Sequence, residues 1–393
     1  MVLVLVLALW FSASAVVPTL RAEWGLSTQG AIWLTATVQI GFASGAVLSA
    51  VLNLPDRIPP PVLVSAAALL GALATAAVAL TVSSAVAAVP LRFLTGFALA
   101  GVYPTCMKIV VSWFPGARGS ALGVLIGALT LGSAMPQLLN AVSTLAWTGV
   151  MLGAALLAVL GAAISVLFVR VGPNTRPSPP LEPKYVLRMF ADRPQRLVNL
   201  GYFGHMWELY ALWTWLPAYV AASYGAWSPQ AGTRAAVSLT VFVVIGLAGG
   251  TGCVLAGRLA DRHGRALVAM VAMLISGGCA VLSVAVFGAH PIVLGLVLLV
   301  WGAAVVADSA QFSAALSEVA DPRYIGTALT AQTAIGFLIS VLTIQGLPLL
   351  AGIVGWSAAV PLLAVGPLLG AIAMGRLRAI TRSGPARPVE PMP

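Results

Sequence analysis

Apolar segments long enough to cross a lipid bilayer follow one another along this chain of 393 residues. A transmembrane helix needs about 20 predominantly apolar residues. Twelve such segments are expected, at 2–20, 29–51, 62–82, 87–111, 119–142, 146–169, 197–220, 234–256, 266–288, 291–314, 325–350 and 356–377. Only 8% of the residues are charged, against about 25% in ordinary soluble domains, which excludes a water-soluble fold. We predict an all-α membrane protein with twelve transmembrane helices, the first of them retained and not cleaved as a signal peptide.

Basic residues set the expected orientation in the membrane. Lys and Arg collect in the short cytoplasmic loops of membrane proteins. Of the 20 Lys and Arg residues, all except Arg21, Arg92 and Arg234 fall on the side that holds both termini. We therefore expect a multi-pass protein of the cell (inner) membrane with cytoplasmic N- and C-termini. The net charge of +10 is spread over these loops and forms no single patch, which argues against a nucleic-acid partner.

A connection rich in proline and charge divides the twelve segments into six and six. It covers residues 171–196, and its composition is typical of a solvated tether. We expect an unstructured cytoplasmic linker there, without a binding role. The expected domains are a six-helix bundle at 1–170, the linker at 171–196, a second six-helix bundle at 197–380 and a disordered cytoplasmic tail at 381–393.

Short motifs recur in the two halves, as expected of a duplicated transporter fold. Asp56 and Arg57 follow the second segment, and Asp261 and Arg262 follow the eighth. The stretch G-R-L-A-D-R-H-G-R at 257–265 resembles the loop signature G-x-L-a-D-R-x-G-R of the major facilitator superfamily, and the resemblance extends over the whole chain. It implies the major facilitator fold, in which two pseudo-symmetric six-helix bundles enclose a central cavity.

The signature also has a physical rationale. Glycines permit a tight turn between antiparallel helices, and a carboxylate beside a helix N-terminus favours the helix dipole while it pairs with arginines. We expect this cluster to latch the cytoplasmic helix ends together; alternatively, its charges only set the topology. The candidate gating residues are Gly257, Asp261, Arg262, Gly264 and Arg265, with Asp56 and Arg57 in the degraded first copy, L-P-D-R-I-P-P at 54–60.

Arg92 is a basic residue placed within an expected span. Ionisable residues in hydrocarbon are energetically unfavourable and are functional candidates by default. The stretch L-R-F-L-T-G at 91–96 is similar to the R-x-x-x-G pattern of helix four in the superfamily, whose proton-coupled members use that arginine in coupling. The alternative is that Arg92 extends to the membrane interface.

Two further stretches bear on the branch of the superfamily. Drug-efflux antiporters typically carry G-P-x-x-G-G in helix five, whereas this chain reads G-A-L-T-L-G-S-A-M-P at 127–136. The run G-V-Y-P at 101–104, followed by Lys108, Trp113 and Phe114, loosely resembles branches that move small organic or inorganic anions, such as cyanate and nitrate. The resemblance therefore favours a small anion over drug efflux.

Acidic residues inside the spans are the candidates for coupling to protons. Glu208 lies near the middle of the seventh span, with His205 three residues earlier on the same helical face. A carboxyl group in hydrocarbon favours its neutral form and histidine titrates near neutrality, so this pair could take up and release a proton. The alternative is a neutral Glu208 with a structural hydrogen bond to a neighbouring helix.

The tenth span adds Asp308 as a coupling or substrate candidate, on one helical stripe with Gln311 and Glu318. Glu318 is expected to belong to the following loop and to pair with Arg323. The family resemblance implies that helices one, four, seven and ten line the cavity. Asp308 would then share a common space with Arg92 and with the carboxylate of the seventh span.

Aromatic and amide side chains are the candidates for contacting a solute. Tyr103, Trp207 and Tyr210 lie deep in the fourth and seventh spans, although aromatic belts at the membrane interfaces account for many such residues. The amides could bind a solute or a neighbouring helix. They are Gln137, Asn140, Gln311 and Gln332.

The sequence contains no motif for catalysis, nucleotide binding or a metal cluster, and its three cysteines are isolated within spans. We expect no enzyme activity, no cofactor and no metal. The hypothesis is a monomeric secondary active transporter that moves a small polar solute by alternating access, with a proton as coupling ion in symport and with an anion favoured. The alternatives are proton-driven efflux of drugs and toxic compounds, and a non-transporting membrane sensor or scaffold.

Overall fold

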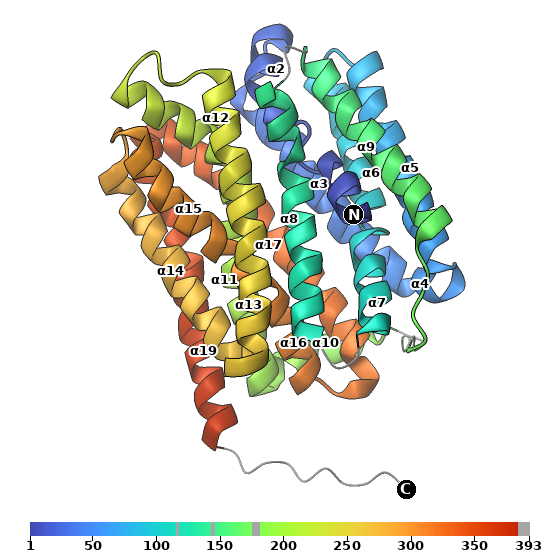
Figure 1. Cartoon of the computed structure of the whole chain (residues 1–393). Coiled ribbons are helices and arrows are strands. Elements are labelled where there is room, and N and C mark those ends of the chain that lie inside the picture. Colours follow the sequence, from blue (N-terminus) through green and yellow to red (C-terminus); the bar gives the residue numbers. More distant parts are fainter. Residues whose placement is uncertain (115–117, 143–145, 175–180, 384–393) are drawn as a thin grey trace, which may run out of the picture.

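The structure, a computed structural model, describes residues 1–114, 118–142, 146–174 and 181–383, and this part of the chain is helical without any strand. The helices before residue 170 gather on one side of the molecule and those after residue 193 on the other (Figure 1). We call these groups the first half and the second half. The face that carries helix α10 (Pro183–Ala191) is called the linker side.

The first half begins with an interrupted helix. Its helices are α1 (Val2–Val6), α2 (Val17–Trp24), α3 (Thr28–Val51), α4 (Leu54–Arg57), α5 (Pro60–Thr81), α6 (Ala85–Leu99), α7 (Tyr103–Trp113), α8 (Arg118–Val142) and α9 (Trp147–Phe168). Side chains cap several of them: Ser27 Oγ accepts a hydrogen bond of 3.0 Å from the amide of Gly30 and so starts α3.

The second half begins with the longest helix. Its helices are α11 (Arg193–Trp227), α12 (Arg234–Val241), α13 (Gly249–His263), α14 (Arg265–Val286), α15 (Pro291–Ala307), α16 (Ser309–Val319), α17 (Ile325–Val354), α18 (Trp356–Ala359) and α19 (Val365–Ser383). Asp192 caps α11 by accepting a hydrogen bond of 3.0 Å from the amide of Gln195. Helices α12 and α13 are joined without a loop through a π-helical stretch, Phe242–Ala248.

Ten helical segments of the described chain are long and apolar enough to cross a membrane. The pair Val2–Leu9 and Ser14–Trp24, bent by 55°, makes an eleventh if it is one span. The remaining expected span, 197–220, lies within the 35-residue α11, which is not apolar enough to count. Helix α11 tolerates its polar and aromatic residues because most of its middle is buried against protein. The expectation of twelve apolar spans is therefore corrected to eleven apolar spans and one more polar, buried helix.

The two halves meet along two helix pairs, α3 with α17 and α8 with α13. Glycines permit the second crossing, because a Cβ atom at Gly257 would lie 2.8 Å from the carbonyl oxygen of Gly119 and 3.3 Å from the Cα of Gly123. Small residues allow membrane helices to approach closely. A larger side chain at position 257 would push the two halves apart.

Breaks interrupt some of the spans near their middle. The first span breaks between Leu9 and Ser14, the fourth between α6 and α7, and the tenth at Asp308, between α15 and α16. Backbone that leaves the helix at membrane depth is tolerated only where protein buries it or where it lines a cavity. These breaks therefore mark the interior of the molecule as the place for its polar groups.

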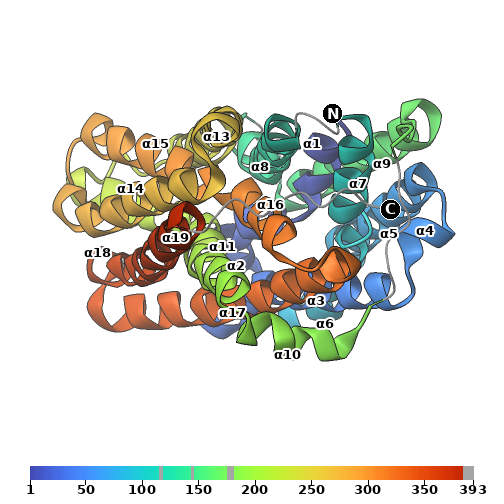
Figure 2. The same cartoon turned by 90° about the horizontal axis from the view of Figure 1, so that it is seen from below.

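The linker is more ordered than expected. Helix α10 buries Tyr185 and Met189, and Figure 2 shows it alongside α17. The Tyr185 hydroxyl donates to Gln195 Oε1 and accepts from the amide of Asp321, both at 3.1 Å, and its ring stacks on Tyr324. The prediction of an unstructured tether is wrong for 183–191, because the apolar residues of α10 share one face and find a partner surface.

The predicted tail also differs at its start, since α19 continues to Ser383. The rest of that tail, 384–393, lies outside the described residues, as do 175–180 of the linker.

Candidate functional site

A cavity of about 880 Å³ lies between the two halves, walled by residues of α3, α7, α8, α11, α16 and α17. Its end on the linker side, which we call the mouth, includes Asn174 and Leu181 of the linker. Its opposite end, the floor, is formed by Tyr210, Trp213 and Phe337. The cavity is therefore framed by both halves and by the segment that joins them.

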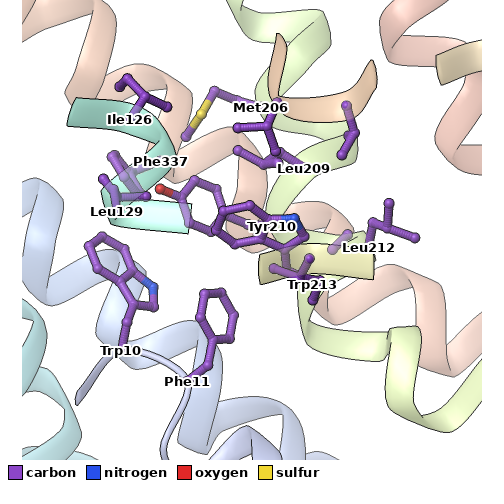
Figure 3. Packing of buried hydrophobic residues seen from close by; sticks show 14 of the residues in the cluster. Trp10, Phe11, Ile126, Leu129, Met206, Leu209, Tyr210, Leu212, Trp213 and Phe337 are labelled. Carbon is purple, nitrogen blue, oxygen red and sulfur yellow. The ribbon is translucent and has the colours of Figure 1, made fainter. Parts of the chain in front are cut away.

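Aromatic residues of both halves pack together at the floor. Trp10 stacks on Tyr210 with ring centroids 5.6 Å apart (Figure 3). The ring centroids of Phe42 and Phe337 are 4.4 Å apart. In each pair the first residue belongs to the first half and the second residue to the second half. Such pairs contribute roughly 0.5–1.5 kcal/mol beyond their buried area, so the cluster holds the halves together opposite the mouth.

His205 and Asp308 form a buried pair beside the cavity. Nδ1 of His205 lies 2.8 Å from Oδ1 of Asp308, and each side chain is 3% exposed. On the other side of the ring, Nε2 lies 3.0 Å from Oγ of Ser309. His205 and Ser309 line the cavity, whereas Asp308, at the break between α15 and α16, lies behind them. The imidazole thus connects a buried carboxylate to the cavity, an arrangement that can bind and release a proton.

Glu208 points into the second half and not into the cavity. Its carboxylate accepts hydrogen bonds from Ser276 Oγ at 2.8 Å and from Trp301 Nε1 at 2.7 Å. These donors come from α14 and α15, and Glu208 is absent from the described lining of the cavity. The expected pairing of His205 with Glu208 is therefore not what the structure shows, since His205 contacts Asp308 instead.

Arg92, in α6, holds the interruption of the first helix. Its guanidinium donates to the carbonyl oxygens of Leu9 (3.2 Å), Trp10 (2.7 Å) and Leu34 (3.3 Å) and to Ser12 Oγ (3.2 Å). The side chain is 0% exposed, so the alternative that it extends to the membrane interface is wrong. No ion pair within the described residues includes Arg92. Arg92 does not share a common space with Glu208, and its charge lies behind the cavity floor.

Asp261 connects the two halves on the linker side. Its Oδ2 accepts hydrogen bonds from the backbone amide of Ser120 (3.1 Å) and from the Ser120 hydroxyl (2.7 Å), at the N-terminus of α8. A carboxylate is stabilised there by the free amides and by the helix dipole. Gly264, with φ +86°, makes the turn that follows, and Arg262 is exposed. The described partner of Asp261 is thus a helix end and not the expected arginine.

The first copy of the motif is arranged differently. Asp56 contacts Lys108 in an ion pair, and both residues belong to the first half. Arg57 is exposed at the end of the short helix α4. Because its partner Lys108 also lines the cavity, Asp56 helps to shape the mouth.

A second ion pair lies at the mouth. Arg265 Nε lies 2.5 Å from Glu318 Oε1, and both residues line the cavity. The expected pairing of Glu318 with Arg323 is wrong, because Arg323 pairs with Asp321 at 2.7 Å. Arg323 and Asp321 are two residues apart on one turn, so they pair without any tertiary contact. The Arg323 guanidinium lowers the pKa of the Asp321 carboxyl below its usual value.

The solute-contact candidates separate into two groups. Tyr103 and Tyr210 line the cavity. The others are buried or half-buried in contacts within the protein: Trp207 Nε1 donates to the Leu362 carbonyl, Gln332 donates to Asn199, Asn140 bonds Ala15, Ser238 and Arg234, and Gln137 and Gln311 are buried. In this conformation none of that second group belongs to the described cavity wall.

Sequence reasoning overlooked the hydroxyl groups of the cavity. Ser309, Ser313 and Ser317 line it from α16, and Tyr202 lines it from α11. The serines recur every fourth residue, which places them on one helical face. That spacing is visible in the sequence, but the prediction considered only the helical stripe through Asp308 and Gln311.

Comparisons with known proteins agree with this architecture. The family model described as Major Facilitator Superfamily matches residues 1–344. Among solved structures, the chain is similar to one titled as the MFS proton:xylose symporter XylE bound to 6-bromo-6-deoxy-D-glucose, with a TM-score of 0.70 and 15% identity over 96% of this chain and 97% of that chain. At this identity the similarity shows the fold alone. No curated protein matches the sequence.

Proposed function

Because the chain belongs to the major facilitator superfamily, it is a multi-pass membrane protein and a secondary transporter of a small molecule, and we propose that it couples transport to protons through His205 and Asp308. The observation that carries the proposal is the buried contact of 2.8 Å between these side chains, with the imidazole on the cavity wall. Ionisable groups buried at membrane depth mark proton relays and substrate paths.

The contrast between the two buried carboxylates supports this choice. Asp308 is joined to the cavity through His205, so a proton can reach it from the cavity. Glu208 is enclosed by Ser276 and Trp301 and has no such link among the described contacts. We therefore assign proton exchange to His205 and Asp308, and to Glu208 a supporting role in packing α11 against α14 and α15.

The character of the cavity supports a small polar solute, with an anion favoured. Arg92 places a positive charge behind the floor without an acidic partner among the described residues, whereas Lys108 and Arg265 at the mouth are paired with Asp56 and Glu318. The linker side is taken as cytoplasmic because the basic residues of the loops collect there. Efflux of cations or drugs would need acidic residues free to bind a cation in the cavity. Asp308 is paired with His205, and Glu208 lies outside the described cavity wall, so this alternative loses support.

The test uses purified protein in proteoliposomes and the solute that most raises the melting temperature in a panel of small polar solutes. An imposed pH gradient should drive accumulation of that solute in the wild type. Asp308→Asn should abolish accumulation but retain exchange of labelled for unlabelled solute, since exchange needs no net proton movement. Undiminished accumulation in Asp308→Asn would refute the assignment.

Glu208→Gln is the matched control, because it removes the same charge from a neighbouring site. Its amide oxygen can still accept from Trp301, so accumulation should persist. Loss of coupling in Glu208→Gln with retention in Asp308→Asn would exchange the roles of the two carboxylates.

A further inference from the structure

We infer that the solute is a small monocarboxylate with an apolar or aromatic body, whose carboxylate binds the hydroxyl groups of Tyr103 and Tyr210 near the floor of the cavity. This inference rests on the proposed function and names the substrate class of the same cavity. Tyr103 comes from the first half and Tyr210 from the second half, so one carboxylate would touch both halves.

Unused hydrogen-bond donors carry the inference. Tyr103 and Tyr210 line the cavity, and neither hydroxyl forms a hydrogen bond within the described chain. Trp213 also lines the cavity, is 2% exposed, and its buried Nε1 has no partner there. An indole N–H can only donate. Trp213 Nε1 is a buried donor without a partner, which is unfavourable, and the two tyrosine hydroxyls are further donors in the same cavity, so together these groups indicate a ligand that accepts hydrogen bonds.

Tyrosines of both halves line the same cavity. Tyr103 belongs to α7 of the first half, and Tyr202 and Tyr210 belong to α11 of the second half. In Figure 3 the hydroxyl oxygen of Tyr210 lies on the side of Leu129 and Phe337, both cavity residues. Donors from two helices of opposite halves can therefore converge on a single oxyanion.

The distribution of charge selects an anion. Glu318 is the only carboxylate in the described lining, and Arg265 pairs with it at the mouth. Arg92 lies behind the floor and donates to the Trp10 carbonyl, without an acidic partner among the described residues. A bound anion would compensate this buried positive charge, whereas a cation would increase the imbalance.

The apolar part of the wall selects an organic anion. Ile126, Leu129, Met206, Leu209 and Phe337 line the same cavity as the donors. Figure 3 shows these five side chains around Tyr210. An inorganic anion would leave this surface in contact with water, whereas a hydrocarbon chain or an aromatic ring would cover it.

Ligand binding to the full chain in detergent tests the inference, with benzoate as the probe. Its amide, benzamide, has the same shape without the charge, benzylamine carries the opposite charge, and nitrate lacks the apolar body. Benzoate should raise the melting temperature and bind at least about 10-fold more tightly than the other three, because hydrogen bonds to a charged acceptor are the stronger ones. Equal affinity for benzamide or benzylamine, or binding of nitrate without benzoate, would overturn it.

Removal of single hydroxyls locates the site. Tyr103→Phe and Tyr210→Phe should each weaken benzoate binding about 10-fold, the effect expected for one hydrogen bond to a carboxylate. Tyr219→Phe is the control, because the Tyr219 hydroxyl donates at 2.7 Å to the Ser283 carbonyl outside the cavity. It should leave benzoate affinity unchanged. Unchanged affinity in both cavity variants would overturn the assignment, and if these variants do not fold, the comparison of ligands on the wild type decides alone.

The outcomes distinguish this inference from the proposed function. If benzoate does not bind but another solute accumulates under a pH gradient and loses this in Asp308→Asn, the substrate class is wrong and the coupling stands. If benzoate binds as described but accumulation is insensitive to Asp308→Asn, the coupling is wrong and the substrate class stands.

Discussion

The substitution Asp261→Asn should shift the protein toward conformations in which the linker-side ends of α8 and α13 lie farther apart. Asp261 makes two hydrogen bonds to Ser120 across the contact between α13 and α8. Hydrogen bonds to charged groups contribute about 1.5–3 kcal/mol each, and less where the carboxylate is exposed, as it is here. Asparagine retains one neutral acceptor, so we expect the variant to lose about 1–2 kcal/mol, which is about a 5- to 30-fold change in the ratio of conformations.

Distances between spin labels measure this change directly. Phe114 and Leu259 are exposed, lie on the first and second halves near the linker side, and can each be replaced by a labelled cysteine once the three buried native cysteines have been substituted. Asp261→Asn should increase the population with the longer separation. Asp321→Asn is the matched control, because Asp321 pairs with Arg323 two residues away, within the second half. An unchanged distance distribution in Asp261→Asn, or an equal shift in Asp321→Asn, would refute the latch between α13 and α8.

Two further predictions concern stability. Arg92→Met should lower the free energy of unfolding by about 2–4 kcal/mol, because it leaves buried acceptors at the break of the first helix without a donor. Thermal unfolding in detergent measures this loss, and Arg258→Met, at an exposed position, is the control. Equal losses in the two variants would contradict the prediction. Tyr185→Phe should increase the rate of tryptic cleavage after Arg188 about 5-fold. The reason is that α10 loses the hydrogen bonds that hold it against α11 and against the loop before α17. An unchanged cleavage rate would show that apolar packing alone orders the linker.

The helical architecture could be predicted because it depends on local pattern. The period and length of the apolar segments are sufficient to place most of the spans. Helix α11 was the exception in composition, since its tyrosines and tryptophans face protein and a cavity, an environment that no local pattern reports. Helix α10 was overlooked because prolines precede it, although Tyr185 and Met189, one turn apart, were a visible sign of an amphipathic helix.

The site could be predicted only in part, because its contacts join distant segments. The sequence singled out His205 and Asp308 as ionisable groups at membrane depth, and this needs no knowledge of their neighbours. Whether His205 faces Glu208 or Asp308 depends on how α15 and α16 break and pack against α11, which periodicity does not contain. Arg92 was likewise found by its depth, but three of its four acceptors are backbone carbonyls of the first span and of α3, which leave no mark in the sequence.

The most direct test of proton coupling follows the proton itself. Proteoliposomes loaded with a pH-sensitive dye are given the transported solute on the outside only, with protein-free liposomes to correct for passive leakage. In the wild type the lumen should acidify in step with solute entry, and in Asp308→Asn this acidification should be absent. Solute entry into wild-type proteoliposomes with no change of lumenal pH would contradict proton coupling.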